Sequence, residues 1–299
     1  EHRVVARAFG DKDWPELGDY LRRVLREDRD PLGGPLFLVA NLAEAHRPWK
    51  GVPEGHDFLP RRGKLQFDNE DYDGAWRRFL EGRMEGESAA RFLAQVNDVY
   101  DYGIERADAG LAAILSSARE VGWCRDECRV VVTSDHGEFI GEHGLVDHGF
   151  YTWEANSRVF VVAAGTGAGS LPEPLSATAV FHLVRDGKLP AQLPEVSSAA
   201  WPHVRRSLHT VGKAFGSVSA ARWSGQHKET WIDGQFMSFD LYVDPFEARP
   251  AALSPDADFA GFAARVEAAA TVAPAKRKAG VADDDAALME ALEAAGYME

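Results

Sequence analysis

Cysteine is scarce in this sequence, and positive charge and long apolar runs are scarce as well. Two cysteines in 299 residues are too few for a disulfide framework. Cys124 and Cys128 are close enough in sequence to pair or to bind a metal, but a structural zinc site normally takes about four ligands. We therefore expect two reduced, uninvolved thiols, which favours a reducing compartment such as the cytoplasm.

The charge balance and the hydropathy pattern exclude two classes of partner. The chain has 33 basic and 47 acidic side chains, for a formal net charge of −14. A surface this negative repels nucleic acids and anionic lipids. No apolar run approaches the roughly 20 residues that cross a bilayer, so no membrane segment is expected. The chain opens on Glu1 without Met, so we expect the natural start, and any export signal, to lie upstream.

The first 190 residues show alternating helical and strand patterns. Helical spacing of apolar residues predicts a helix from Trp14 to Arg26 and a long one from Ser88 to Glu120. Three short apolar runs predict strands buried on both faces: Leu36–Asn41, Arg129–Ser134 and Arg158–Ala164. This alternation predicts an α/β fold with a parallel or mixed sheet flanked by helices.

The pattern changes towards the C terminus. Short segments predict a small antiparallel sheet, with Asp233-Gly234 as a hairpin turn. Its expected strands are Val204–Leu208, Ala220–Trp223, Lys228–Ile232 and Gln235–Phe239. Helices are expected at Ser254–Thr271 and Asp283–Tyr297. The predicted parts are therefore residues 1–190 (α/β), 191–250 (small antiparallel sheet) and 251–299 (helical tail).

The strongest chemical signal is Ser134-Asp135-His136-Gly137-Glu138, at the carboxyl end of a predicted strand. Open α/β sheets place their sites at such ends. Asp135 and His136 suit a divalent cation such as Ca²⁺, Mn²⁺ or Zn²⁺. The alternative is that Asp135 caps a helix and His136 is incidental. Gly137 is expected to let the chain turn sharply after them.

Two other segments add polar side chains near predicted strands. His46 follows the first predicted strand, and Asp147-His148 precedes the third. In a parallel sheet the carboxyl ends of strands meet at one edge, so we expect these residues to lie near Asp135 and His136.

These segments resemble the sulfatases and their phosphonate monoester hydrolase and phosphotransferase relatives, in the alkaline phosphatase superfamily. Ser134–Glu138 followed by Gly141–Gly144 matches the family signature closely. Asn41–Trp49 is similar to the family's Asn-x-x-x-Pro-His-x-Pro-Tyr segment, with Ala45 in place of the first Pro. Leu241–Pro245 resembles the family's terminal Leu-Tyr-Asp-Leu-x-x-Asp-Pro element in shortened form.

The resemblance implies an incomplete alkaline phosphatase-like fold and a metal-dependent sulfuric ester hydrolase. Asp135 and His136 would bind the metal, with Ca²⁺ expected first and Mn²⁺ or Zn²⁺ as alternatives. His46 and His148 would be the catalytic and substrate-binding residues that contact the ester oxygens, and His148 stands where the family often has a Lys. Glu138 and His143 would order the loop. The substrate would be a small-molecule or glycan sulfate ester.

One element of the family is missing from these residues. The family's nucleophile is a Cys converted to formylglycine, or a Ser or Thr, in a Cys/Ser/Thr-x-Pro-x-Arg motif, and no such motif occurs here. We therefore expect the formylglycine to lie outside this chain, and the chain alone to be inactive. The alternatives are a phosphate or phosphonate ester hydrolase, a phosphotransferase of the same superfamily, and a non-catalytic anion-binding module.

Overall fold

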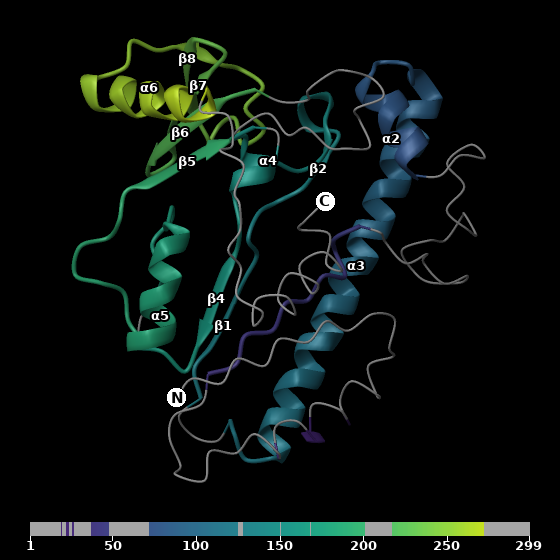
Figure 1. Ribbon diagram of the computed structural model, residues 1–299, viewed down its shortest axis with the longest axis vertical. Helices are drawn as coiled ribbons and strands as arrows, with labels where there is room; N and C mark the ends of the chain where they lie inside the picture. Colours follow the sequence, from purple (N-terminus) through teal and green to yellow (C-terminus); the bar gives the residue numbers. More distant parts are fainter. Residues whose placement is uncertain are drawn as a thin grey trace. The chain divides into compact units, whose positions relative to one another are not determined.

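A computed structural model describes the greater part of the chain (Figure 1). The described residues are 19, 22, 23, 26, 37–47, 72–124, 128–149, 151–167, 169–200 and 217–271. The chain divides into two compact units, Glu1–Cys128 with Val281–Glu299, and Arg129–Gly280. The predicted boundaries after residues 190 and 250 stay predictions. The predicted strand Val204–Leu208 and the predicted helix Asp283–Tyr297 lie outside the described residues.

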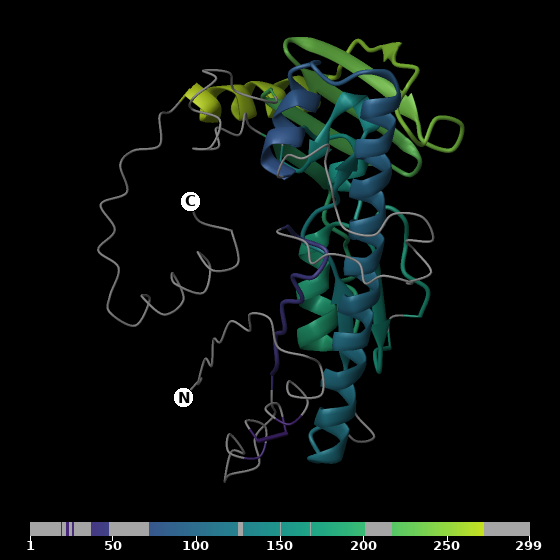
Figure 2. The same cartoon turned by 90° about the vertical axis from the view of Figure 1, so that its right-hand side faces the viewer.

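The first unit contains a long helix that the sequence predicted. Helix α2 spans Tyr72–Leu80 and helix α3 spans Gly86–Glu120, which continues unbroken in two views (Figures 1 and 2). The buried side chains of α3 recur at helical spacing, as at Phe92, Val96 and Val99. Segment 37–47 passes so close to α3 that a Cβ on Gly103 would lie 2.4 Å from the carbonyl oxygen of Glu44.

The predicted strand Leu36–Asn41 is not formed among its described residues, 37–41. Phe37 and Val39 are instead 72% and 73% exposed. An apolar segment of this composition is buried as a strand only where neighbouring strands pair with it and helices cover it. No strand among the described residues pairs with residues 37–41. The apolar run predicted a buried strand, but burial depends on partner segments that the local sequence does not identify.

The cysteine prediction is also corrected in the first unit, because Cys124 and Cys128 form a disulfide. This pairing removes the reason for favouring a reducing compartment. Among the described residues, no helix has both the length and the apolar character needed to span a membrane.

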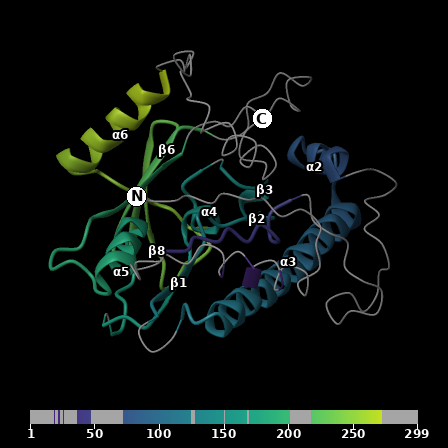
Figure 3. The same cartoon turned by 60° about the horizontal axis from the view of Figure 1, so that its bottom comes forward.

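The second unit begins with a strand pair. Strands β1 (Val130–Thr133) and β4 (Val161–Ala164) form where strands were predicted, but they pair antiparallel, with Val132 opposite Val162. Every ladder among the described residues is antiparallel, so the predicted parallel pairing is not observed. The described residues between β1 and β4 form no long crossover helix, and an antiparallel return needs none. Helix α5 (Val180–Asp186) lies beside this pair (Figure 3).

The predicted small antiparallel sheet is present and has five strands in the order β5-β6-β7-β8-β9. The strands are β5 Val196–Ala200, β6 Ser219–Ser224, β7 His227–Ile232, β8 Gln235–Asp240 and β9 Ala251–Ala252. Asp233 and Gly234 join β7 to β8 with positive φ angles of 50° and 81°, as a tight hairpin turn requires. The predicted Asp233-Gly234 hairpin turn is confirmed.

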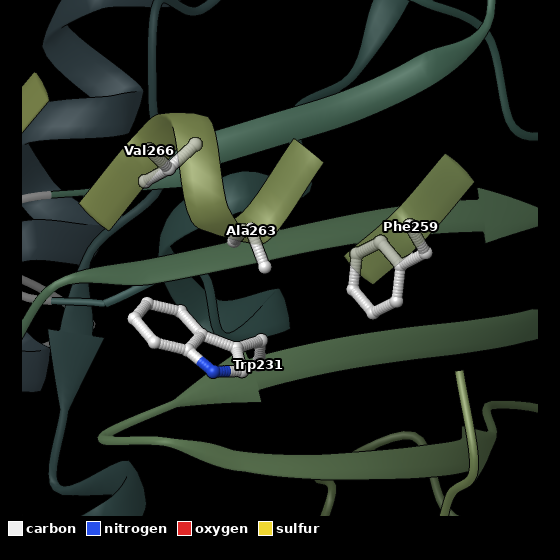
Figure 4. Close-up of a cluster of buried hydrophobic side chains, with 5 residues drawn as sticks. Trp231, Phe259, Ala263 and Val266 are labelled. Atoms are coloured by element: carbon white, nitrogen blue, oxygen red, sulfur yellow. The ribbon is translucent and has the colours of Figure 1, made fainter. Parts of the chain in front are cut away.

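Helix α6 (Ala257–Thr271) packs on this sheet and forms its core. Figure 4 shows Phe259, Ala263 and Val266 of the helix facing Trp231 of β7. Ala220 of β6 completes the cluster, and Phe259 is 1% exposed.

We expect Phe259→Ala to lower the free energy of unfolding by about 3–5 kcal/mol, because it leaves a cavity in a fully buried cluster. Urea denaturation followed by tryptophan fluorescence measures the change, since Trp231 lies in the same cluster. Phe246→Ala makes the same chemical change at a side chain that is 71% exposed, and it should shift the free energy by no more than about 0.5 kcal/mol. Equal effects of the two substitutions would contradict this description of the core.

Candidate metal centre

The end of β1 presents the first two predicted metal ligands. Asp135 has an exposed side chain, and its Oδ1 accepts the backbone N–H of His136 at 3.0 Å. His136 Nδ1 lies 2.8 Å from the carbonyl oxygen of Gly137. A carbonyl only accepts, so Nδ1 carries the proton and Nε2 of the neutral ring has a lone pair. Asp135 Oδ1 lies 3.8 Å from His136 Nε2, so the two potential donors face one region.

Gly137 is required here by a close approach of two backbones. Its N–H donates to the carbonyl of Asn156 at 2.8 Å, and a Cβ at this position would lie 2.1 Å from the carbonyl oxygen of Ala155. Gly137 does not have a positive φ. The sequence therefore marked the right glycine for a different reason, because what matters is the absence of a side chain and not a sharp turn.

A small hairpin then brings Glu138 and His148 together. Strands β2 (Phe139–Ile140) and β3 (Val146–Asp147) pair with Phe139 opposite Asp147, which makes Glu138 and His148 the next pair along. His148 Nδ1 lies 3.0 Å from Glu138 Oε2 and 3.0 Å from Asp147 Oδ1. Asp147 has a φ of 90°, an uncommon conformation for a residue other than glycine, immediately before His148.

The hairpin and the end of β1 meet at two histidine rings. The rings of His136 and His148 stack with centroids 4.0 Å apart and planes 26° apart. Donor atoms of His136, Glu138 and His148 all lie within 4.8 Å of one another. We call these three residues the His–Glu–His cluster. From the sequence, Glu138 was expected only to order the loop, and no pattern in the sequence indicated that it pairs with His148.

The electrostatics of the cluster favour a cation. Burial raises the pKa of Glu138, and the hydrogen bond from His148 opposes that rise. The Asp147 carboxylate beside it is fully buried. Two buried carboxylates with no fixed positive charge among the cluster residues make an environment that a bound cation would stabilise.

The donor set fits a metal, but it does not favour the ion that was expected. Ca²⁺ prefers six to eight oxygen ligands, whereas imidazole nitrogens with a carboxylate suit Zn²⁺, Mn²⁺ and similar ions. Of the predicted site residues, the structure brings His136 and His148 together, with Asp135 next to them. His46 lies in the first unit, where its Nδ1 contacts the carbonyl oxygen of Arg47, and its role stays a prediction.

Helix α4 (Glu154–Ser157) supports the cluster from behind. Asn156 accepts the N–H of Gly137 with its backbone carbonyl and the N–H of Gly149 with its side-chain oxygen, the latter at 3.0 Å. It therefore joins the residue after His136 to the residue after His148. Its side-chain nitrogen donates to the carbonyl of Tyr151 at 3.1 Å, which fixes the orientation of the amide.

A buried lysine fixes α4 in turn. The side chain of Lys228 in β7 is fully buried, and its Nζ lies 2.6 Å from the Thr152 carbonyl oxygen, 3.1 Å from Glu154 Oε1 and 2.6 Å from Glu247 Oε1. Nζ also lies 4.7 Å from the ring centroid of Trp223, whose indole N–H donates to Glu154 at 2.8 Å. This network connects the five-stranded sheet to the segment that carries Asn156.

No protein-family model matches the chain, and no curated protein matches it. Several solved structures are similar to it, and three of them are described here. One, solved with its substrate D-glucosamine-2-N,6-O-disulfate, is 17% identical over 67% of this chain and 45% of that chain, with a TM-score of 0.42. A candidate sulfatase, yidJ from Bacteroides fragilis, is 14% identical over 79% of this chain and 52% of that chain (TM-score 0.49). A protein described with glycosaminoglycan metabolism by Bacteroides thetaiotaomicron is 14% identical over 85% of this chain and 58% of that chain (TM-score 0.49).

The chain spans about half the length of these solved structures, from 45% to 58%.

Replacing Gly137 with Ala should disrupt the site, because the new Cβ would overlap the Ala155 carbonyl and force α4 away from β1. We expect a lower melting temperature and the loss of the His136–His148 stacking, measured by thermal denaturation and by the imidazole signals in NMR spectra. Gly261→Ala is the matched control, since a Cβ there meets only Arg265 Nη1 at 3.5 Å within helix α6. That variant should be neutral or more stable by about 0.5–1 kcal/mol. A Gly137→Ala protein with wild-type stability and spectra would contradict the close approach.

Lys228→Met should lower the free energy of unfolding at neutral pH by about 3–5 kcal/mol, because two buried carboxylates lose their cation. Burial already raises the pKa of Glu247, and Lys228 opposes that rise. Without the lysine, the charged form of Glu247 is penalised above its folded pKa, and the penalty is relieved as the pH falls towards the unfolded value of about 4.3. The destabilisation should therefore be smaller at pH 5 than at pH 8 in chemical denaturation.

The exposed Lys188 gives the matched control, since Lys188→Met should change stability by no more than about 0.5 kcal/mol at either pH. If Lys228→Met lowers the free energy of unfolding only slightly, or lowers it more as the pH falls, then Lys228 does not stabilise the two buried carboxylates.

Proposed function

We propose that this chain carries part of the metal and substrate site of a metal-dependent sulfuric ester hydrolase. The observation that supports the proposal most is the His–Glu–His cluster, because two of its members, His136 and Glu138, lie in the Ser134–Gly144 segment whose sequence resembles the sulfatase signature.

Each residue has a proposed role. Asp135 and His136 hold a divalent cation, which when bound neutralises the charge of an anionic ester and helps to activate a nucleophile. His46 and His148 are the proposed contacts to the ester oxygens, as the family resemblance implies. Glu138 orients His148 through its Nδ1–H. No nucleophile is assigned within these residues, because they contain no Cys/Ser/Thr-x-Pro-x-Arg motif.

The proposed substrate is a small-molecule or glycan sulfate ester. Phosphate and phosphonate esters are the alternative, because all of these groups are tetrahedral oxyanions that a cation would bind in the same way. The alternative without catalysis is a module that only binds such an anion.

The full-length protein should hydrolyse 4-nitrophenyl sulfate faster than 4-nitrophenyl phosphate, and a chelator should abolish the activity. Asp135→Asn should lower kcat/KM by about 100-fold or more, since a bound cation contributes several kcal/mol of charge stabilisation. Asp258→Asn, at an exposed position of helix α6, serves as the matched control and should leave kcat/KM unchanged.

Faster hydrolysis of the phosphate ester would favour the phosphoryl-transfer alternative. Cleavage of neither ester, combined with metal-dependent sulfate binding in calorimetry, would favour the binding module. Cleavage of neither ester and no sulfate binding would contradict the proposal as a whole.

A further inference from the structure

His46 lies on a segment that no backbone ladder fixes. Residues 37–47 form neither a helix nor a strand, and no strand among the described residues pairs with them. The chain makes one turn immediately before the ring, in which the N–H of His46 donates to the carbonyl of Ala43 at 3.0 Å. The position of His46 therefore depends on what this segment packs against.

The turn before His46 lies directly on the backbone of helix α3. A Cβ added to Gly103, which is buried, would lie 2.4 Å from the Glu44 carbonyl oxygen, 2.9 Å from the Glu44 carbonyl carbon and 2.8 Å from Ala45 Cα. These are backbone atoms of the two residues that precede His46, so they cannot rotate away as the end of a flexible side chain could. The turn therefore occupies the space that any side chain at position 103 would fill.

The residue after His46 packs on the other helix of the first unit. Arg47 Cζ lies 5.9 Å from the ring centroid of Trp76 in α2, which is 2% exposed, and a guanidinium over an indole ring is attracted to it. The Nδ1 of His46 contacts the carbonyl oxygen of Arg47. A carbonyl only accepts, so Nδ1 carries the proton and the lone pair of the neutral ring is on Nε2. The ring is thus bonded to a stretch of backbone that contacts α3 on one side and α2 on the other.

Resting on the proposed function, we propose that Gly103 is a positioning residue for His46. The missing side chain lets the Glu44–Ala45 turn lie on α3, and this contact sets where His46 presents Nε2 to the ester. Gly103 contacts no substrate and acts only through His46. Trp76 supports the same ring from the other side, through Arg47.

The expected size of the effect follows from the overlap. Atoms in ordinary contact are at least 3.4 Å apart, so a methyl group at position 103 would displace the Glu44 carbonyl by about 1 Å. A misplacement of about 1 Å at a reacting group can slow a reaction by about 100-fold. In a helix with open space around the glycine, the same change is neutral or stabilising.

A double-mutant cycle in the full-length protein, with 4-nitrophenyl sulfate as substrate, tests the proposal. Gly103→Ala should lower kcat by about 10- to 100-fold, and His46→Gln by about 100-fold or more. In the His46→Gln background, Gly103→Ala should cause no further loss, because the ring through which it acts is gone. Gly261→Ala, the same change in helix α6 with only Arg265 Nη1 nearby, is the matched control and should leave kcat unchanged.

A second readout needs no activity. In NMR spectra of the 299-residue chain, Gly103→Ala should shift the imidazole signals of His46 and leave those of His182, in helix α5, unchanged. If Gly103→Ala does not fold, Arg47→Met is the second variant, because it removes the contact with Trp76 on the other side of the ring. It should shift the His46 signals and lower kcat by about 10-fold, again only where His46 is present.

Failure of this inference can be separated from failure of the proposed function. The inference is wrong if Gly103→Ala lowers kcat equally with and without His46, if the His46 signals do not shift in the folded variant, or if His46→Gln keeps the wild-type kcat. In each of these cases the sulfate ester is still cleaved by the wild-type protein, and the proposed function stands. If the His46 signals shift as expected but the protein cleaves neither ester, the packing of His46 on α3 stands and the proposed function is wrong.

Discussion

The candidate site depends on one close contact between two backbones. Gly137 lies against Ala155 with no room for a side chain, and its N–H bonds to the next carbonyl, that of Asn156. This contact fixes where the chain leaves β1 and therefore where the His136 ring points. Asn156 accepts the N–H of Gly149 as well, so one residue of α4 fixes the backbone immediately after His136 and immediately after His148. The stacked rings follow from these constraints.

The second support comes from the five-stranded sheet. Lys228 connects β7 to Thr152 and Glu154 at the beginning of α4, and Glu247 binds the N–H of Glu154 at 2.6 Å. Burying three charged side chains is costly unless each is paired, and here every member has a partner with a short contact. Helix α6 covers the sheet and supplies the apolar burial that this network lacks (Figure 4). A sheet without predicted catalytic residues thus determines the position of the site.

What the sequence could predict was local. Helix α3, strand β1 and the Asp233-Gly234 hairpin are confirmed, because residue spacing and turn chemistry specify each of them over a few residues. The strand expected at Leu36–Asn41 and the parallel pairing depended on distant partners, which periodicity does not identify. The proximity of Glu138 and His148 was missed for a related reason. It depends on the register of two strands of two residues each, too short for any pattern to reveal.

The central claim is that Asp135 and His136, at the end of β1, hold a divalent metal ion. The most direct measurement is anomalous diffraction at the zinc absorption edge from crystals of the chain grown with Zn²⁺. The account predicts one strong peak about 2.0–2.1 Å from a ring nitrogen of His136, with the Asp135 carboxylate beside it. No peak at His136, or a peak held only by residues away from the end of β1, would contradict it.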